Sequence, residues 1–436
     1  MSSAMQRDIP EGYKQTEVGV IPEDWAVSTI GENTRWSSGG TPNRKRDDYW
    51  EGSIPWISGS TLKTLEISTS DQFITAEGVT AGSNMAPVNS TLLLVRGSAL
   101  HKCIRAGLVT SPVSFNQDVK SLMPTGSVHP RFLTFFIKGM ESELLKLVSS
   151  AGNSAGVLDT LLVKNFKFLK PSFSEQTAIA NALSDVDALI TSLENLITKK
   201  RAIKTAAMQQ LLTGKKRLPP FDKTQNGYKQ TELGEIPEDW EIRHLGGIGA
   251  FTKGAGVKKD ESNSGYIPCV RYGEIYTRHS DYIKRFNSYI SKTVSLTATR
   301  LSKGDLLFAG SGETKEEIGK CVAFVDEVEA YAGGDIVILR PQWGDSLFLG
   351  YCLNSDYVVK QKSSKGQGDA VVHISANALK SVQVIMPSSE VEQQSIATVL
   401  FDMDKDIELL DRRLNKTQKL KQGMMQELLT GRTRLV

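Results

Sequence analysis

The sequence predicts an α+β fold with two diverged, β-rich α/β domains in a pseudo-two-fold arrangement, separated by two long helices that form an intramolecular antiparallel coiled coil. Three observations predict it: an internal repeat across the whole chain, short β-rich runs inside each copy, and a helical apolar pattern at the end of each copy. A chain of 436 residues is also longer than one ordinary domain. Its 39% hydrophobic and 23% charged residues are typical of a folded protein.

The repeat is visible in three anchors. The segment GYKQTEVGVIPEDW begins at Gly12 and returns as GYKQTELGEIPEDW at Gly227, with twelve identities in fourteen positions. Near the end of each copy, EQTAIANALSDVD from Glu175 pairs with EQQSIATVLFDMD from Glu392, and MQQLLTGKKRL pairs with MQELLTGRTRL. The shift between copies is 215 residues at the first anchor and 217 at the other two, so the chain is a tandem duplication.

Between the anchors, residues 26–173 and 241–388 diverge. They carry runs such as STLLLVRG, KGDLLFAG, GKCVAFV and GDIVILRP, bounded by Gly, Ser, Asn and Pro, which predict short strands. A thin scaffold is shared, for example IPWI against IPCV and Asp118 against Asp335. We therefore expect two compact, strand-dominated domains with a common frame and different surfaces.

The end of each copy predicts a long helix, because apolar residues recur at steps of three and four. The expected seam residues are Ile179, Leu183, Val186, Ile190, Leu193 and Ile197 in the first helix, and Ile396, Leu400, Met403, Ile407, Leu410 and Leu414 in the second. Each helix should end at Leu-Leu-Thr-Gly, where Gly214 and Gly431 can adopt the left-handed conformation. The domain division expected from these patterns is 1–173, 174–226, 227–388 and 389–436.

Charge predicts the direction in which the two helices pair. Residues 174–193 sum to −3 and residues 194–213 to +3, and the second helix repeats this polarity with −4 and +3. Antiparallel packing places each acidic half beside a basic half, and each sign suits its own helix dipole. In this register Lys421 lies near Asp185 and Asp187, and Lys204 near Asp402 and Asp404. The alternative, in which both lysines are solvated, is equally open because surface ion pairs contribute little.

Two unlike domains on a symmetric, rigid frame suit DNA, which offers two half-sites at fixed spacing and phase. The GYKQTE-x-G-x-IPEDW starts, the segment SGGTP at Ser38–Pro42 followed by IPWI, and the helix ends LLTGKKRL and LLTGRTRL resemble the specificity subunits of type I restriction-modification enzymes. The resemblance covers nearly the whole chain. It implies two target recognition domains, each reading one half of an asymmetric bipartite site in double-stranded DNA. It also implies that the helices set the spacer between the half-sites and dock two methyltransferase subunits.

The resemblance further implies that this chain is not itself an enzyme and binds no cofactor. S-adenosylmethionine would belong to the N6-adenine methyltransferase subunits, and ATP with Mg²⁺ to motor-nuclease subunits that join the full complex. The alternative function is a coiled-coil scaffold whose two domains bind proteins.

Three motifs could suggest catalysis, and each fails on its pattern. Leu218-Pro219-Pro220-Phe221 lacks the Asn that an amino-methyltransferase needs to hold a flipped adenine. Asp305 with Glu313-x-Lys315 is too loose a pattern for a nuclease site, and Thr314 stands where a phosphate-binding loop requires Gly. We therefore predict no catalytic residue and no metal site.

Candidate DNA contacts are loop residues that can form paired hydrogen bonds with base edges or neutralise phosphates. In the first domain they are Ser38, Thr41, Asn43, Arg44, Lys45, Arg46, Arg96, Ser98, Asn116 and Gln117. In the second they are Lys253, Lys258, Lys259, Arg271, Tyr272, Glu274, Arg278, Lys315, Lys365 and Gln367. Trp25 and Trp240 also invite a stacking role, but they lie in the most similar part of the two copies, so we expect them in the core.

The net charge of +3 neither requires nor excludes a polyanionic partner, so any basic patch must be local. No stretch approaches eighteen apolar residues and the start lacks a leader pattern, so we expect no membrane partner and a cytoplasmic location. The four cysteines form no C-x-x-C pair, which favours free, mostly packed thiols over zinc ligands or disulfides.

Overall fold

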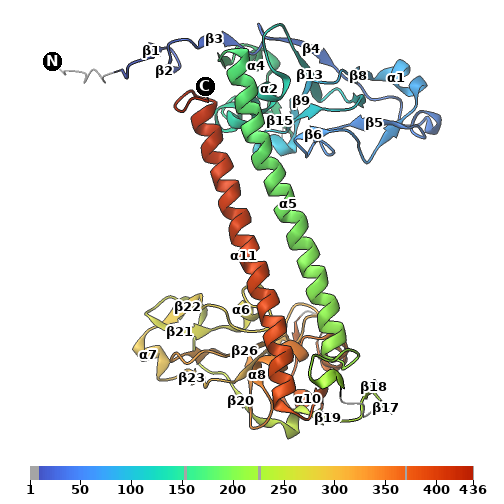
Figure 1. Cartoon of the computed structure of the whole chain (residues 1–436), viewed down its shortest axis with the longest axis vertical. Helices are drawn as coiled ribbons and strands as arrows, with labels where there is room; N and C mark the ends of the chain where they lie inside the picture. The colour runs from blue at the N-terminus through green and yellow to red at the C-terminus, as the bar shows by residue number, and fades with distance from the viewer. Residues whose placement is uncertain (1–8, 152–154, 224–226, 369–370, 436) are drawn as a thin grey trace, which may run out of the picture. The chain divides into compact units, whose positions relative to one another are not determined.

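The computed structural model describes residues 9–151, 155–223, 227–368 and 371–435 (Figure 1). The chain divides into two compact units. Unit 1 comprises residues 1–194 and 412–436, and unit 2 comprises residues 195–411. Each unit is described by itself below, and we call residues 26–173 domain 1 and residues 241–388 domain 2.

Domain 1 is built on two main sheets. The five-stranded sheet has the order β4 (Thr34–Ser38), β13 (Val119–Pro124), β9 (Thr91–Leu94), β11 (Ala106–Val109) and β6 (Glu66–Ile67). The four-stranded sheet has the order β7 (Phe73–Ile74), β5 (Ile54–Ile57), β12 (Val113–Phe115) and β8 (Asn84–Ala86), with β5 and β12 parallel.

Smaller elements complete unit 1. The additional strands are β10 (Arg96–Gly97), β15 (Ala155–Leu158) and β14 (Val148–Ala151) in one sheet, the pair β3 (Ala26–Thr29) and β16 (Lys167–Lys170), and the hairpin β1 (Tyr13–Thr16) and β2 (Gly19–Pro22). The short helices are η1 (Asp47–Tyr49), α1 (Ala76–Gly82), η2 (Ser98–His101), α2 (Pro130–Gly139), α3 (Glu141–Leu145) and α4 (Thr160–Lys164).

Domain 2 repeats this plan. One sheet has the order β20 (Gly249–Lys253), β28 (Ile336–Pro341), β24 (Leu306–Ala309) and β26 (Cys321–Ala323). The other has the order β22 (Ser288–Ile290), β21 (Ile267–Val270), β27 (Tyr331–Ala332) and β23 (Thr299–Arg300), with β21 and β27 parallel. The remaining strand pairs of unit 2 are β25 (Ser311–Gly312) with β29 (Val372–His373), β19 (Trp240–His244) with β30 (Gln383–Pro387), and β17 (Tyr228–Thr231) with β18 (Gly234–Pro237).

Unit 2 also contains several short helices between its strands. They are η3 (Phe221–Lys223), η4 (Leu245–Gly247), η5 (Lys259–Glu261), α6 (Tyr272–Thr277), α7 (Lys292–Ser295), α8 (Ser346–Cys352), α9 (Asp356–Lys365) and α10 (Ala376–Lys380).

The apolar runs of the sequence form the central strands. All four residues of β9 are buried, and so are all four of β24. In unit 1, α2 packs on the sheet of β3 and β16 through aromatic side chains. Phe136 and Phe132 both contact Phe168, with ring centroids 4.8 and 6.0 Å apart. Burial of each such ring stabilises the fold by about 2–3 kcal/mol, so these contacts hold α2 on the sheet.

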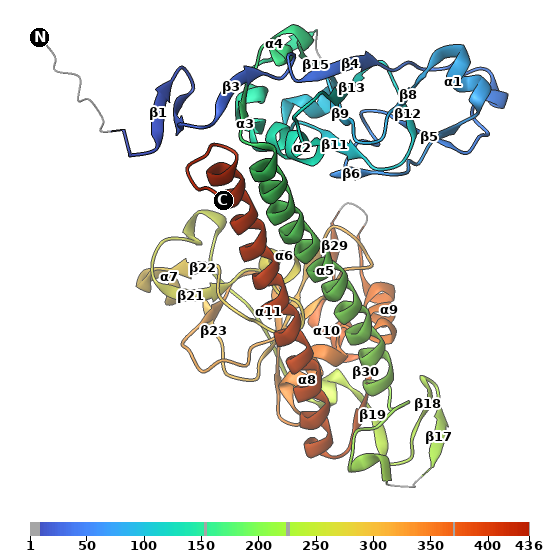
Figure 2. The ribbon, with the colours of Figure 1, turned by 45° about the horizontal axis from the view of Figure 1, so that its top comes forward.

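The long helices α5 (Phe173–Leu211) and α11 (Glu390–Leu428) each contribute one half to each unit. In unit 1, Lys421 of α11 forms a 2.5 Å ion pair with Asp187 of α5. In unit 2, Lys204 of α5 forms a 2.8 Å ion pair with Asp404 of α11. Residue numbers rise along one helix as they fall along the other, so the predicted antiparallel pairing is confirmed (Figures 1 and 2).

The structure also selects one carboxylate from each predicted pair. Asp187 and Asp404 bind the lysines, whereas Asp185 and Asp402 are exposed. None of the twelve predicted seam residues is exposed. The buried ones are Ile179, Leu183, Leu193, Ile197, Ile396, Leu400 and Ile407, and the half-buried ones are Val186, Ile190, Met403, Leu410 and Leu414.

Each long helix ends as the sequence predicts, in a left-handed glycine. The φ angles are +72° at Gly214 and +73° at Gly431. Just beyond the second glycine, Arg434 binds Asp24 at 2.8 Å and the buried Glu175 at 2.6 Å. Glu175 also accepts a 3.0 Å hydrogen bond from Nε1 of Trp25, and Trp25 is fully buried, as predicted.

Unit 2 repeats this arrangement. Arg217 binds Asp239 at 2.9 Å and Glu392 at 2.6 Å, beside the buried Trp240. Hydrogen bonds that Arg217 donates to Glu392 raise the pKa of its guanidinium, which stays charged although the side chain is only 8% exposed. The repeated anchors of the sequence therefore form the same ionic cluster at the helix end in each unit.

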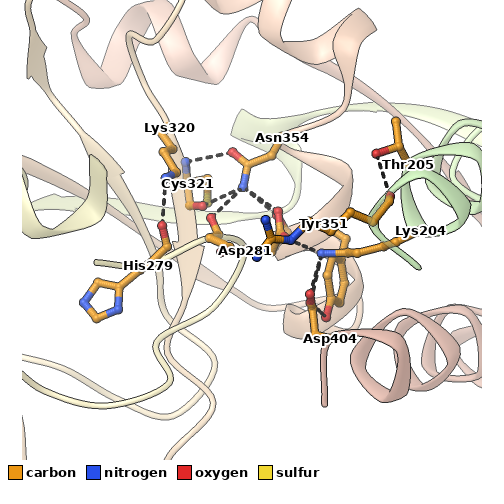
Figure 3. Close-up of polar contacts among 12 residues, drawn as sticks. Lys204, Thr205, His279, Asp281, Lys320, Cys321, Tyr351, Asn354 and Asp404 are labelled. Atoms are coloured by element: carbon orange, nitrogen blue, oxygen red, sulfur yellow. Dashed lines mark hydrogen bonds and ion pairs between the residues drawn. The ribbon is translucent and has the colours of Figure 1, made fainter. Parts of the chain in front are cut away.

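A buried polar network in unit 2 ties both long helices to domain 2 (Figure 3). Lys204 binds Asp281 of domain 2 at 3.0 Å as well as Asp404, and the three side chains are at most 13% exposed. Tyr351 of α8 donates a 2.8 Å hydrogen bond to Asp404, and Asn354 donates a 3.1 Å bond to Asp281. Burial lowers the pKa of Lys204, but the two carboxylates outweigh it and the pKa lies above its usual value.

The predictions for the cysteines are confirmed. All four are free, and Cys269, Cys321 and Cys352 are buried. Burial raises the pKa of these three thiols to about 12. Among the helices that the structure describes, none combines the length and the apolar composition needed to cross a bilayer.

Candidate nucleic-acid interface

The first candidate surface of domain 1 lies where the loop after β4 meets the turn between β12 and β13. Ser38 pairs with Lys120 across the β4 and β13 ladder. Gly40 then donates a 2.9 Å backbone hydrogen bond to the Phe115 carbonyl. A Cβ on Gly39 would lie 2.0 Å from that carbonyl oxygen, so this close approach requires the glycine of the SGGTP segment.

This approach gathers polar side chains into one cluster. Thr41 donates a 2.6 Å hydrogen bond to Oε1 of Gln117, and Lys120 donates a 2.8 Å bond to Oγ of Ser38. Nδ2 of Asn84 donates a 2.6 Å bond to the Ser38 carbonyl. We call Ser38, Thr41, Asn84, Gln117 and Lys120 the polar patch. Its hydroxyl, amide and ammonium groups are the kinds that read base edges.

The rest of the predicted loop is exposed and basic. The Arg44 guanidinium stacks 3.8 Å from the Trp50 ring centroid, and Arg46 forms a 2.6 Å ion pair with Asp48. The hydrogen bond from Arg46 lowers the pKa of Asp48. Oδ1 of Asn43 accepts a 3.0 Å bond from the Lys45 amide, which shapes the turn. Exposed pairs of this kind exchange readily with other anions.

A polar cavity of about 700 Å³ opens next to the same turn. It brings together three predicted residues, Arg96, Ser98 and Asn116. Three further cations that the sequence analysis missed also line it, namely Lys63, Lys102 and Arg105. We call this site the basic cavity. Lys102 and Arg105 follow the strand and turn that carry Arg96 and Ser98 within a few residues. This closeness in sequence could have predicted them.

Domain 2 has a cavity with a different chemistry next to Asp335, the counterpart of Asp118. It has a volume of about 470 Å³, and Lys253 is the predicted residue that lines it. Oγ of Ser311 lies 2.9 Å from Nδ1 of His373, and Asp335 adds a carboxylate at φ +59°. The sequence analysis did not name Ser311, His373 or Asp335 as contacts.

The other candidates in domain 2 are spread over several loops. Arg271 precedes α6, Tyr272 begins it and Arg278 follows it, while Glu274 accepts bonds from the Arg271 amide and the Ser288 hydroxyl. Lys258, Lys259 and Lys315 are exposed, and Lys365 ends α9. Gln367 is exposed and exchanges two backbone hydrogen bonds with His373, so it borders the cavity of domain 2.

The carboxylates of the rejected nuclease motif are not arranged for catalysis. Asp305 is fully buried and both its oxygens bind Arg340 at 2.8 Å. Within the described part of the chain, no group of three or more His, Cys, Asp or Glu side chains is placed to hold a metal ion.

Comparison with known proteins agrees with this duplicated architecture. A family model described as the type I restriction modification DNA specificity domain matches residues 22–204 and again residues 237–419. The chain belongs to this family. Each specificity domain therefore spans one β-rich domain and most of the long helix that follows it.

Two curated relatives carry the same description. The EcoR124I/EcoR124II specificity subunit of Escherichia coli is 32% identical over 189 residues, which is 43% of this chain and 45% of that protein. The MjaVIII specificity subunit of Methanocaldococcus jannaschii is 26% identical over 435 residues, covering 98% of this chain and 96% of that protein. The predicted resemblance to specificity subunits is thus confirmed.

Solved structures confirm the fold class. The S subunit of a type I restriction-modification system from M. genitalium matches with a TM-score of 0.59 at 16% identity, covering 93% of this chain and 96% of that chain. A chain from a structure of the type I R-M system, titled for its complex assembly and conformational transition, matches with a TM-score of 0.54 at 14% identity, covering 95% and 99%.

Proposed function

We propose that this chain is the non-catalytic, DNA-reading subunit of a type I restriction-modification complex. Each target recognition domain reads one half of an asymmetric bipartite site. The recognition domains lie within residues 1–173 and 227–388, and residues 174–226 and 389–436 carry the long helices with their basic ends. The helices set the spacer between the half-sites.

The observation that carries this proposal is a shared backbone frame with different side chains at equivalent places. In domain 1 the backbone amide of Asn116 donates a 2.9 Å hydrogen bond to the Ile57 carbonyl. In domain 2 the Gly333 amide donates the equivalent 2.9 Å bond to Val270. Next to this shared frame, exposed Ser38 pairs with Lys120 in domain 1, whereas exposed Lys253 pairs with Val337 on the matching strands of domain 2. Different hydrogen-bonding groups on one frame suit two different base sequences.

The exposed faces of the long helices support docking of partner subunits. Leu196 and Ile203 of α5 are 40% and 46% exposed, and Leu409 and Leu420 of α11 are 65% and 57% exposed. Apolar side chains on these outer faces are available for burial against a partner subunit. We assign these faces to two N6-adenine methyltransferase subunits, one for each copy of the repeat.

The chemistry of the complex then belongs to the partners. S-adenosylmethionine is held by the methyltransferase subunits, and ATP with Mg²⁺ by motor-nuclease subunits in the full assembly. This chain supplies DNA binding and geometry, and it works in the cytoplasm, where the DNA lies.

Selection from random double-stranded DNA tests this function. The full-length chain, with and without its methyltransferase subunits, is mixed with a random duplex pool, and the retained fragments are sequenced. We expect enrichment of one asymmetric site with two fixed halves and an unspecified spacer. Retention without any enriched sequence, or no retention in both cases, would contradict the proposal and favour a protein-binding scaffold.

A further inference from the structure

We propose, building on the function above, that the basic cavity of domain 1 binds phosphates of the DNA backbone, whereas the neighbouring polar patch reads base edges. Affinity and sequence choice in this domain are thus assigned to different residues. The basic cavity contributes binding to any duplex, and the polar patch contributes the preference for one half-site.

The first argument is unbalanced charge. Lys63, Arg96, Lys102 and Arg105 all line the basic cavity, and Asp118 is the single carboxylate in the lining. Asp118 is engaged with Asn116, whose Nδ2 donates to it at 3.3 Å. Among the described residues, neither Lys63, Arg96 nor Lys102 forms an ion pair. Four cations around one carboxylate repel each other, and a polyanion removes that repulsion.

Several other cations of unit 1 form ion pairs. Arg131 binds Glu66 at 2.5 Å, Lys167 binds Glu17 at 2.7 Å and Lys146 binds Glu143 at 2.8 Å. Acidic partners are therefore available in this unit. Lys63, Arg96 and Lys102 are gathered around one cavity without such partners among the described residues.

The second argument is a fixed scaffold beneath the cations. Arg96 lies on β10, in register with Val157 of β15. NH1 of Arg105 donates a short hydrogen bond to the Gly59 carbonyl, which holds this guanidinium at the cavity wall. Lys63, Arg96 and Lys102 are exposed and reach the opening. One anchored and three exposed cations suit an anion whose position varies little with sequence.

The third argument is the contrast with domain 2. Asp118 and Asp335 occupy matching positions, since the amide after β9 donates to the Asp118 carbonyl and the amide after β24 donates to the Asp335 carbonyl, both at 2.8 Å. The cavity of domain 2 that Asp335 lines has Lys253 as its single Lys or Arg. The excess of cations beside this position is therefore a feature of domain 1.

The test measures binding of the full-length chain with its methyltransferase subunits to two duplexes over a series of salt concentrations. One duplex carries the selected site and the other carries a scrambled first half-site. The double variant Arg96→Gln with Lys102→Gln is compared with Lys146→Gln with Lys167→Gln. The control pair carries the same change in charge, but on lysines outside the basic cavity.

Loss of two phosphate contacts should reduce the slope of log K against log salt by about 1.8, because each contact contributes about 0.9. Affinity should fall by the same factor on both duplexes, so the ratio between them stays at the wild-type value. The control variant should retain the wild-type slope. A wild-type slope in the cavity variant, or a loss confined to the selected duplex, would overturn the assignment.

Two single variants separate phosphate binding from base reading. Arg96→Lys should keep the slope, because a lysine still neutralises a phosphate, whereas a guanine-reading arginine cannot be replaced in this way. Gln117→Ala in the polar patch should lower the ratio between the duplexes and leave the slope unchanged. Failure of the wild-type complex to discriminate the duplexes would instead count against the proposed function itself.

Discussion

His279 shows how burial of one side chain makes the stability of the protein depend on pH. It is 4% exposed, and neither ring nitrogen has a hydrogen-bond partner in the structure. Its ring points away from the polar network that surrounds its backbone, where Lys320 donates a 2.7 Å bond to the His279 carbonyl (Figure 3). Burial, aided by the charge of Lys320, lowers the pKa of His279 to about 4.

This lowered pKa predicts acid destabilisation. The unfolded chain binds a proton at His279 near pH 6.5, and the folded chain does so only near pH 4, so stability is lost as the pH falls between these values. The expected loss between pH 7.5 and pH 5 is about 2 kcal/mol. Urea unfolding at both pH values should show a smaller loss for His279→Leu than for the wild type. The exposed His101→Gln is the control, and an equal loss in all three proteins would contradict this origin.

Residue-level prediction from the sequence succeeded where partners lie on regular elements. Asp187 and Asp404 follow from helical register, because their positions opposite the lysines depend on heptad spacing alone. Asp281 could not be predicted, since it reaches Lys204 from a loop that only the tertiary fold places there. Lys63 was missed for the same reason, because it enters the basic cavity from a different strand connection than Arg96.

At the scale of elements, the two units anchor the helix pair differently. In unit 2, Lys204 is shared by two buried carboxylates. In unit 1, Lys421 has one carboxylate partner in Asp187 and lies 5.5 Å from the Phe135 ring. The side chains of Lys421 and Asp187 are 21% and 26% exposed, so this pair is partly desolvated and simpler to test.

Charge reversal tests the register of the helices. Lys421→Glu places two carboxylates together and should lower the free energy of unfolding by about 1–2 kcal/mol. Adding Asp187→Lys should restore most of the loss, as measured by thermal unfolding. Adding Asp185→Lys instead should not, because Asp185 is exposed and lies two positions away from the contact residue Asp187. Equal rescue by both second substitutions would show a general charge effect and not this register.

The sequence predicted the elements better than their arrangement in sheets. The spacing of apolar residues predicts both long helices, and the distribution of charge predicts that they run antiparallel. Both properties can be read locally from the chain. The parallel pairing of β5 with β12, and of β21 with β27, joins strands far apart in sequence, and nothing in the local pattern marks it. The two cavities depend on those pairings, so their linings became visible only in the fold.

In the whole molecule, we propose that the long helices determine the spacer length. Residues 191–194 of α5 face residues 414–417 of α11 in the observed register. Deleting both segments shortens each helix by four residues. Ile197 then follows Ile190 by three positions, so the apolar spacing of the seam is kept. Four residues correspond to about 6 Å of helix, so the permitted spacer should change by one or two base pairs, roughly. Methylated sites read by sequencing should keep both half-site sequences. An unchanged spacer would show that the helices do not set it.

The central claim is that each domain reads its own half of the site, and exchanging one domain tests it most directly. Residues 26–173 are replaced by the corresponding segment of a diverged specificity subunit, and the adenine methylation motif of the resulting complex is determined by sequencing. We expect a motif in which one half changes while the other half and the spacer stay as in the wild type. A motif altered in both halves, or in neither, would contradict it.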